Sequence, residues 1–173
     1  MRIVGLVGPR GSGKDTVATM LKSLFPALQV FAFADPVRAV CTELFLLQPD
    51  QLRDRVLKET KDPRWDLSPR QMMQRVGTDL VRQHLDVDQW LRLMQVRLEA
   101  ARAAGCAIAV LSDVRFANEA ALCSSLIRID RCSTGSARDH VSETEQMGIE
   151  CDITINNRGS MQQLRAQVER LLL

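Results

Sequence analysis

A glycine-rich stretch directly after a short apolar run is the feature of this chain that most constrains its fold. Residues 2–7 read RIVGLV, and residues 8–16 read GPRGSGKDT. The apolar run predicts a buried strand, and the amphipathic pattern that begins at Gly13 predicts a helix. A strand that enters a helix through a glycine-rich turn is typical of α/β folds with a parallel sheet.

The spacing from Gly8 to Lys14 matches the pattern GxxxxGK of a phosphate-binding loop. Glycines let successive backbone N–H groups point inward at phosphate oxygens, the helix N-terminus adds its positive end, and Lys14 adds a full charge. The alternative is a strand–helix turn without a ligand. Because both the spacing and the strand–loop–helix context are present, the sequence favours phosphate binding.

Asp15 departs from this pattern, because the usual loop has Ser or Thr directly after the lysine and here Thr16 follows one place later. A hydroxyl at that place binds Mg²⁺ directly. We hypothesise that Asp15 instead lies near the metal through a water molecule, or near the acceptor phosphate.

The remaining chain repeats a rhythm of strands and helices without a linker or an internal repeat, which predicts a single α/β domain over residues 1–173. The predicted strands are apolar runs at residues 2–7, 29–34, 107–112, 126–130 and 152–156. The predicted helices cover residues 13–24, 36–47, 68–85, 88–104, 116–124 and 161–172. Residues 49–86 hold no predicted strand and form a helical insertion, and the polar residues 131–145 form a flap.

Polar residues follow each predicted strand, at the sheet edge where parallel α/β folds bind their ligands. Asp113 has the place of a carboxylate that helps to hold Mg²⁺, with a helix N-cap as the alternative. Asp35 is equally compatible with a cap and with a functional role, and Arg38 lies one turn further on. Arg115 is placed to reach phosphates. Asn118 and Glu119 are expected to orient Arg115 or to satisfy backbone groups.

Within the insertion, several polar residues recur every three to four positions, as on one face of a helix. They are Arg70, Gln74, Gly77, Thr78 and Arg82. This face suits a base and a phosphate, although a solvated helix would show the same spacing. Trp65 and Trp90 are expected in the core and His84 at a surface helix end. In the flap, Arg131 and Arg138 are expected to close over the transferring group, with His140 anchoring the flap.

Composition narrows the class of partner. The net charge is +2, which argues against a dedicated nucleic-acid binder, and no apolar run reaches the length of a membrane span. Five cysteines without a CxxC pair suit a reducing cytoplasm. All basic residues except Lys14, Lys22, Lys58 and Lys61 are arginine, which fits either phosphate recognition or a coding bias.

Together, GSGKDT, FADPVR, RQMMQRVGTDLVR, SDVRFANEA, HVSE and DITINNRGS resemble the bacteriophage-type deoxynucleoside monophosphate (dNMP) kinases, in order and over nearly the whole chain. The resemblance implies a phosphate-loop kinase fold with about five parallel strands, helices on both faces, a helical NMP-binding insertion (residues 49–86) and a lid (residues 131–145). It implies the reaction dNMP + ATP to dNDP + ADP, with Mg²⁺. A phage-encoded enzyme would work in the host cytoplasm, and the apolar helices are compatible with a homodimer.

The resemblance also implies roles for single residues. ATP would contact Gly8, Arg10, Gly11, Ser12, Gly13, Lys14, Asp15, Thr16, Asn156 and Gly159. The dNMP would contact Asp35, Arg38, Arg70, Gln74, Thr78, Arg82 and Arg115. Catalysis would rest on Lys14, Asp15, Arg115, Arg131 and Arg138, and the metal would lie near Asp15 and Asp113.

Two other functions stay open at this point. The first seventeen residues alone also fit a kinase of dephospho-coenzyme A or phosphomevalonate. A nucleotide-binding regulatory module with little turnover would also carry the phosphate loop.

Overall fold

The computed structural model describes residues 1–131 and 145–171. The chain forms two compact units. The first comprises Met1–Ala32 and Met94–Leu173, and the second comprises Phe33–Leu93. The second unit therefore begins before the predicted insertion and ends after it.

The first unit is built on a five-stranded sheet with the strand order β2-β3-β1-β4-β5. The strands are β1 (Arg2–Val7), β2 (Gln29–Phe31), β3 (Ile108–Leu111), β4 (Ser125–Asp130) and β5 (Ile153–Asn156). All four strand pairings are parallel, as the run of short apolar segments predicts. The carboxyl ends of all five strands consequently meet at one edge of the sheet.

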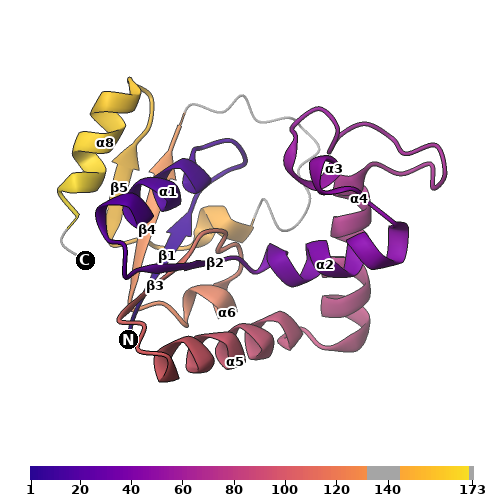
Figure 1. Cartoon of the computed structure of the whole chain (residues 1–173), viewed down its shortest axis with the longest axis horizontal. Helices are drawn as coiled ribbons and strands as arrows, with labels where there is room; N and C mark the ends of the chain where they lie inside the picture. The colour runs from indigo at the N-terminus through magenta and orange to yellow at the C-terminus, as the bar shows by residue number, and fades with distance from the viewer. Residues whose placement is uncertain (132–144, 172–173) are drawn as a thin grey trace. The chain divides into compact units, whose positions relative to one another are not determined.

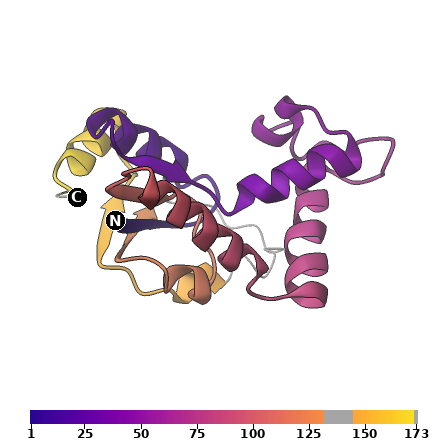
Figure 2. The same cartoon turned by 60° about the horizontal axis from the view of Figure 1, so that its bottom comes forward.

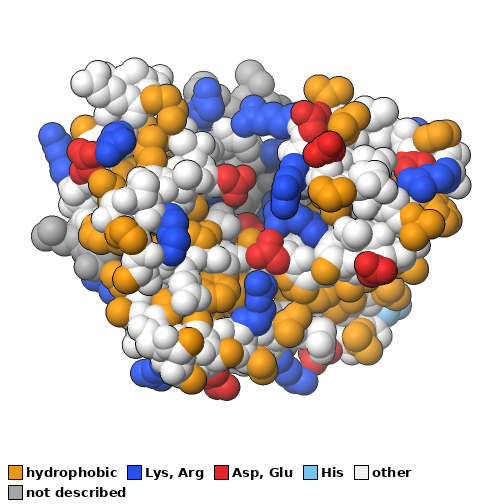
Figure 3. All heavy atoms as spheres, in the orientation of Figure 1, with side chains coloured by type: hydrophobic (Ala, Val, Ile, Leu, Met, Phe, Trp, Pro, Cys, Tyr) orange, Lys and Arg blue, Asp and Glu red, His pale blue; other side chains and the backbone are white. Residues whose placement is uncertain are grey.

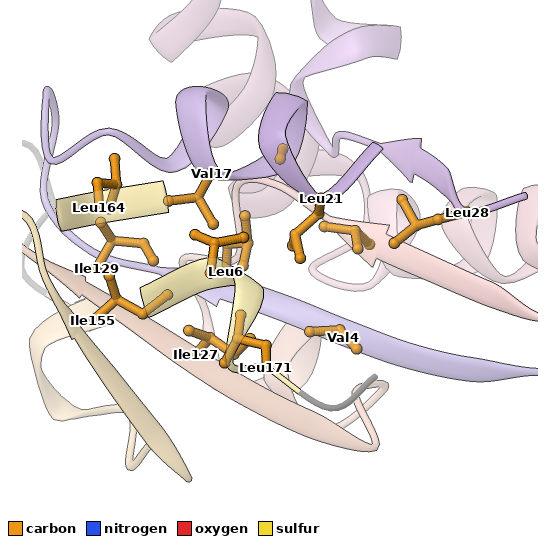
Figure 4. Close-up of a cluster of buried hydrophobic side chains, with 13 residues drawn as sticks. Val4, Leu6, Val17, Leu21, Leu28, Ile127, Ile129, Ile155, Leu164 and Leu171 are labelled. Carbon is orange, nitrogen blue, oxygen red and sulfur yellow. The ribbon is translucent and has the colours of Figure 1, made fainter. Parts of the chain in front are cut away.

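Helices cover both faces of this sheet (Figures 1 and 2). On one face lie α1 (Lys14–Leu24) and α8 (Met161–Glu169), and on the other lie α5 (Gln89–Ala103) and α6 (Ala117–Ala120). Between the sheet and the α1–α8 layer, Leu6, Val17 and Ile129 belong to a cluster of fully buried side chains (Figure 4). This buried layer holds α1, and with it the loop before α1, against β1 and β4.

The second unit is helical. It contains α2 (Ala34–Phe45), α3 (Pro49–Arg53), α4 (Pro69–Gln74) and the helix η1 (Arg75–Leu85), and the first residues of α5. Val37 of α2 packs against Gly77 of η1, where a methyl group would lie 3.3 Å from Val37. Trp90 is buried and donates from Nε1 to the Gly77 carbonyl at 2.8 Å. The predicted core position of Trp90 is thus confirmed.

The prediction of one α-helix over residues 68–85 is wrong in its second part, because η1 is a π-helix. Its hydrogen bonds span five residues, as in the bond from Asp86 N to Val81 O at 2.8 Å. A turn of a π-helix holds more residues than a turn of an α-helix. Residues three positions apart on η1 therefore no longer share a face, whereas residues four positions apart, such as Thr78 and Arg82, still lie on one side of the helix.

Other element bounds differ from the prediction at their ends. Residues 32 and 33 continue the apolar run of β2 but lead into α2 instead, and α6 is a single turn that ends at Ala120. Residues 145–148 form a short 3-10 helix, η2 (Glu145–Gly148). Trp65 is 41% exposed, with its edge against Phe45, so its predicted core position is wrong. Within the described ranges, no helix has the length and hydropathy that a membrane span needs.

Candidate active site

The loop between β1 and α1 has the conformation that its glycines permit. Gly8 has φ of 149° and Gly13, the N-cap of α1, has φ of 102°. Residues with a side chain rarely adopt such positive φ values, whereas glycine adopts them readily. A methyl group at Gly8 would lie 2.5 Å from the Ile129 carbonyl oxygen of β4. The loop thus approaches the neighbouring strand so closely that only glycine fits.

Lys14 is the first residue of α1, and its side chain folds back over the loop. Its Nζ donates to the Pro9 carbonyl at 3.0 Å and also to the Gly8 carbonyl. The ammonium group is therefore held inside the turn, on the residues that precede the helix. A charged donor thus lies at the N-terminus of α1, the kind of position where proteins bind anions.

Ser12 is fully buried at the centre of the loop. Its Oγ has no hydrogen-bond partner among the described residues. A buried polar group without a partner is costly unless a ligand or water satisfies it. The orphaned hydroxyl therefore fits a ligand that supplies hydrogen-bonding oxygens, as a phosphate does.

Asn157, one of the polar residues that follow the predicted strands, connects this loop to the last strand. It lies directly after β5, and its Nδ2 donates to the Ser12 carbonyl at 2.7 Å. Asn157 and Ser12 are separated by 145 residues, so no local sequence pattern predicts their contact. The only signal was the polar doublet after the last apolar run.

Asp113 and Arg115 follow β3 at the carboxyl edge of the sheet. The helix after them begins at Ala117 with Phe116 as N-cap, so the alternative role of Asp113 as the cap of this helix is excluded. Glu119, buried in that helix, accepts from Arg115 N at 2.8 Å and from Phe116 N at 3.3 Å. Its predicted role in satisfying backbone groups near Arg115 is confirmed.

The donor set near the loop fits Mg²⁺ rather than a metal that needs a protein cage. Asp15, exposed on the first turn of α1, and Asp113 offer carboxylate oxygens, and Thr16 offers a hydroxyl. Among the described residues, no three His, Cys, Asp or Glu side chains form a metal-binding group. Mg²⁺ usually keeps several waters and binds one or two carboxylates together with substrate phosphates.

The loop after β5 is tied to its neighbours. Gln167 of α8 accepts from Asn156 N at 3.0 Å and donates to Asn156 O at 2.8 Å. Arg158 donates to Asp130 at 2.7 Å. Asn156 and Gly159 line a cavity of about 560 Å³ along α8, together with Arg158, Gln163, Ala166, Gln167 and Arg170.

In the second unit, Asp35 and Arg38 form an ion pair at 2.6 Å on the first turn of α2. The N-cap of α2 is Phe33, so of the two roles left open for Asp35 the cap before Pro36 is excluded. The carboxylate instead holds the guanidinium of Arg38, and both side chains are partly exposed.

The other arginines predicted to bind dNMP also have protein partners. Arg70 of α4 donates to Glu59 at 2.5 Å. Arg82 of η1 is buried and donates to the Val87 carbonyl at 3.3 Å. Gln74 and Thr78 are half-buried. Figure 3 shows Lys and Arg side chains beside Asp and Glu side chains on the face that it draws, as such pairs produce.

The predicted lid is described only at its borders. Arg131 follows β4 and is exposed. Arg138 and His140 lie outside the described residues. His84 is exposed at the end of η1, as predicted, and its Nδ1 lies 2.6 Å from the Asp79 carbonyl.

Comparison with known proteins identifies the family. The model of the deoxynucleotide monophosphate kinase family matches residues 46–168. The "Putative deoxynucleotide monophosphate kinase" of Acanthamoeba polyphaga mimivirus is 37% identical, over 97% of this chain and 94% of the viral protein. The deoxynucleotide monophosphate kinase of Escherichia phage RB69 is 28% identical, over 61% of this chain and 45% of the phage protein.

A solved structure supports the fold. The protein TT1252 from Thermus thermophilus superimposes with a TM-score of 0.52 at 17% identity, over 97% of this chain and 94% of that protein. The architecture is thus that of a solved α/β protein, while the family assignment rests on the sequence matches. These matches confirm the resemblance that the motifs indicate, and the chain belongs to the deoxynucleotide monophosphate kinase family.

Proposed function

We propose that this protein transfers the γ-phosphoryl group of Mg·ATP to deoxynucleoside monophosphates, giving dNDP and ADP. The observation that carries the proposal is the loop before α1, which holds the Lys14 ammonium inside the turn and also contains the buried Ser12 hydroxyl without a partner among the described residues. Family membership supplies the class of acceptor. Because the relatives are named kinases, the chain is assigned as a phosphotransferase.

On the ATP side, the backbone N–H groups of residues 11–16 and the Lys14 ammonium would bind the phosphates. Asp15 and Asp113 would hold Mg²⁺, directly or through water. When bound, Mg²⁺ neutralises charge on the phosphate oxygens during transfer. The residues after β5, with Asn156 and Gly159, would flank the adenine.

On the acceptor side, the proposal assigns dNMP binding to the second unit and to Arg115 of the first. Arg38, now paired with Asp35, and Arg70, now paired with Glu59, are the cations in that unit for an acceptor phosphate. Gln74 and Thr78 would contact the base or the sugar. Arg82 would support that site from a buried position, because its guanidinium already binds a backbone carbonyl.

Positioning and charge neutralisation carry most of the proposed mechanism. Two anions must be brought in line, and the acceptor is already an ionised phosphate, so no general base is needed. Lys14 and Arg115 would stabilise the transferring group. Arg131, Arg138 and His140 would exclude water, since water would compete with the acceptor.

We also propose a cytoplasmic location, where ATP and dNMP occur together. The free thiols of the described cysteines suit a reducing compartment. A homodimer through the apolar helices is the proposed assembly.

An acceptor panel with Mg·ATP tests the function. ADP release is measured in a coupled assay with the four common dNMPs, the corresponding NMPs, dephospho-coenzyme A and phosphomevalonate. Stimulation by at least one dNMP, with none by the last two acceptors, supports the proposal. Stimulation by dephospho-coenzyme A or phosphomevalonate alone would overturn it.

A further inference from the structure

Asn157 is fixed from two sides in the first unit. Its backbone N–H donates to the Asp130 carbonyl at the end of β4, at 2.7 Å. Its side-chain Nδ2 donates to the Ser12 carbonyl at 2.7 Å, and the residue is 9% exposed. The side chain thus spans from the carboxyl edge of the sheet to the centre of the phosphate loop.

The bond to Ser12 determines which way one peptide group of the loop faces. The chain has no cis peptide bond among the described residues, so the Ser12 C=O and the Gly13 N–H point in opposite directions. Because Asn157 holds the carbonyl on its own side, the Gly13 N–H points to the other side. A rotated peptide would present a carbonyl oxygen there, and a carbonyl oxygen repels a phosphate.

The packing around Gly13 depends on the same side chain. A methyl group on Gly13 would collide with Asn157 Nδ2. Gly13 also has φ of 102°, a left-handed conformation that glycine adopts without steric strain. The Asn157 amide therefore contacts the loop next to Gly13, where the lack of a side chain leaves the backbone the most conformational freedom.

We propose that Asn157 is a positioning residue for nucleotide binding, which orients the Ser12–Gly13 peptide so that the Gly13 N–H faces the phosphates. This inference rests on the proposed function in one respect only, namely that the loop binds the phosphates of ATP. In this role Asn157 does not touch ATP itself but acts through its hydrogen bond to the backbone of the loop.

Three variants separate hydrogen bonding from packing. Asn157→Leu keeps the branching at Cγ and fills the space but has no donor, Asn157→Ser is smaller but keeps a donor, and Asn157→Ala keeps neither. If orientation of the peptide matters, ATP affinity falls in the order wild type, Ser, then Leu and Ala. If only filled space matters, Leu is closest to the wild type and Ser and Ala are equally weak.

The measurement is titration calorimetry of ATP and of dNMP, followed by steady-state kinetics and by thermal unfolding without nucleotide. We expect Kd for ATP to rise about tenfold in Asn157→Leu and Asn157→Ala, as for the loss of one oriented hydrogen bond. The Kd for dNMP stays within about twofold, and Asn157→Ser regains part of the ATP affinity. In the kinetics, KM for ATP rises more than kcat falls. Gln162→Ala, an exposed amide on α8, is the matched control.

Wild-type ATP affinity in Asn157→Leu would overturn the inference, as would equal weakening of ATP and dNMP. Calorimetry with ATP does not depend on the acceptor. If the wild type binds ATP but phosphorylates no dNMP, the proposed function fails while the Asn157 variants still test this inference.

Discussion

Lys14 is bound to backbone carbonyls of the phosphate loop, and these are weaker partners for an ammonium group than a phosphate anion is. A bound nucleotide would therefore draw Lys14 away from Pro9 and Gly8. The side chain is already inside the turn, so little ordering is needed when the phosphates arrive.

Lys14→Ala is expected to lower kcat/KM for ATP by about 10²- to 10³-fold, because a charge aimed at the transferring group is lost. Thermal unfolding monitored by circular dichroism is expected to stay near that of the wild type. Lys61→Ala removes a lysine whose surface pair with Asp66 is largely exposed, and serves as the control. Substantial turnover in Lys14→Ala would contradict the assignment.

Asp15→Asn removes the charge of the residue that follows the lysine and adds no hydroxyl. If Asp15 lies near the metal, removing its charge should raise the Mg²⁺ concentration for half-maximal rate by about fivefold, the effect of about 1 kcal/mol of charge interaction. The rate is measured against free Mg²⁺ at saturating ATP. An unchanged Mg²⁺ dependence and rate would remove Asp15 from the metal site.

Cys41, fully buried in α2, responds to pH through its thiol. Burial raises the pKa of Cys41 from 9.0 to about 11. Between these two pH values the unfolded thiol is ionised while the folded one is not, so the thiol favours folding below pH 9.0 and this contribution is lost as pH rises toward about 11. The free energy of unfolding should fall by about 1 kcal/mol per pH unit in that range.

Urea unfolding of the wild type and of Cys41→Ala at several pH values between these limits measures the effect. The variant is less stable at neutral pH because it loses buried volume. Its stability should decline less steeply with pH. Equal slopes would show that Cys41 does not titrate differently in the two states.

At the scale of elements, β1 shows how tightly the sheet is packed beneath the phosphate loop. A methyl group on Gly5 would lie 2.6 Å from Cys123 Sγ and 2.7 Å from Leu126 Cδ2. The side chains of Cys123 and Leu126 would have to move, since these distances are much shorter than a van der Waals contact. β1, the strand that leads into the phosphate loop, can therefore pack this closely against its neighbours only because residue 5 is glycine.

Gly5→Ala is expected to destabilise the protein by about 1 to 3 kcal/mol through overpacking. Gly148→Ala is the matched control, because a methyl group there meets no atom within 4 Å. Urea unfolding with both variants measures the difference. Equal stability of the two would mean that the β1 neighbourhood relaxes freely.

The elements near the loop were predictable because their signals are local. Gly8, Lys14 and the apolar run before them lie within one short stretch, and Glu119 lies within four residues of the backbone groups it binds. The π-helical part of residues 68–85 was not predictable from spacing, because apolar and polar periodicity does not report the hydrogen-bond register. The Asn157–Ser12 contact was hidden because it joins the two ends of the chain.

Trp65 shows a different limit of sequence reasoning. Aromatic residues are usually buried, yet Trp65 is 41% exposed and is held by one edge-on ring contact and one hydrogen bond. Its Nε1 donates to the Phe45 carbonyl at 3.0 Å, and its ring meets Phe45 edge-on with centroids 5.6 Å apart. Trp65 thus satisfies the last backbone carbonyl of α2, while its indole ring stays partly exposed.

For the whole molecule, the predicted residues for the two substrates fall mainly in different units. The ATP residues lie in the first unit, and all proposed dNMP residues except Arg115 lie in the second. Changes in one set should therefore affect mainly one substrate.

Arg38→Ala is expected to raise KM for dNMP about tenfold, the effect of one lost charge-assisted hydrogen bond. The calorimetric Kd for ATP should stay within about twofold of the wild type. Arg53→Ala, an exposed arginine of α3, is the control. An equal effect of Arg38→Ala on both substrates would place Arg38 outside the acceptor site.

The two edges of the sheet bear on how copies of this protein can associate. β2 spans three residues and β5 spans four, and the Gln167 amide binds both the N–H and the C=O of Asn156 on β5. Short, partly covered edges are poor templates for strand pairing. Two copies are thus discouraged from joining into a continuous sheet, which leaves helix faces as the route to any dimer.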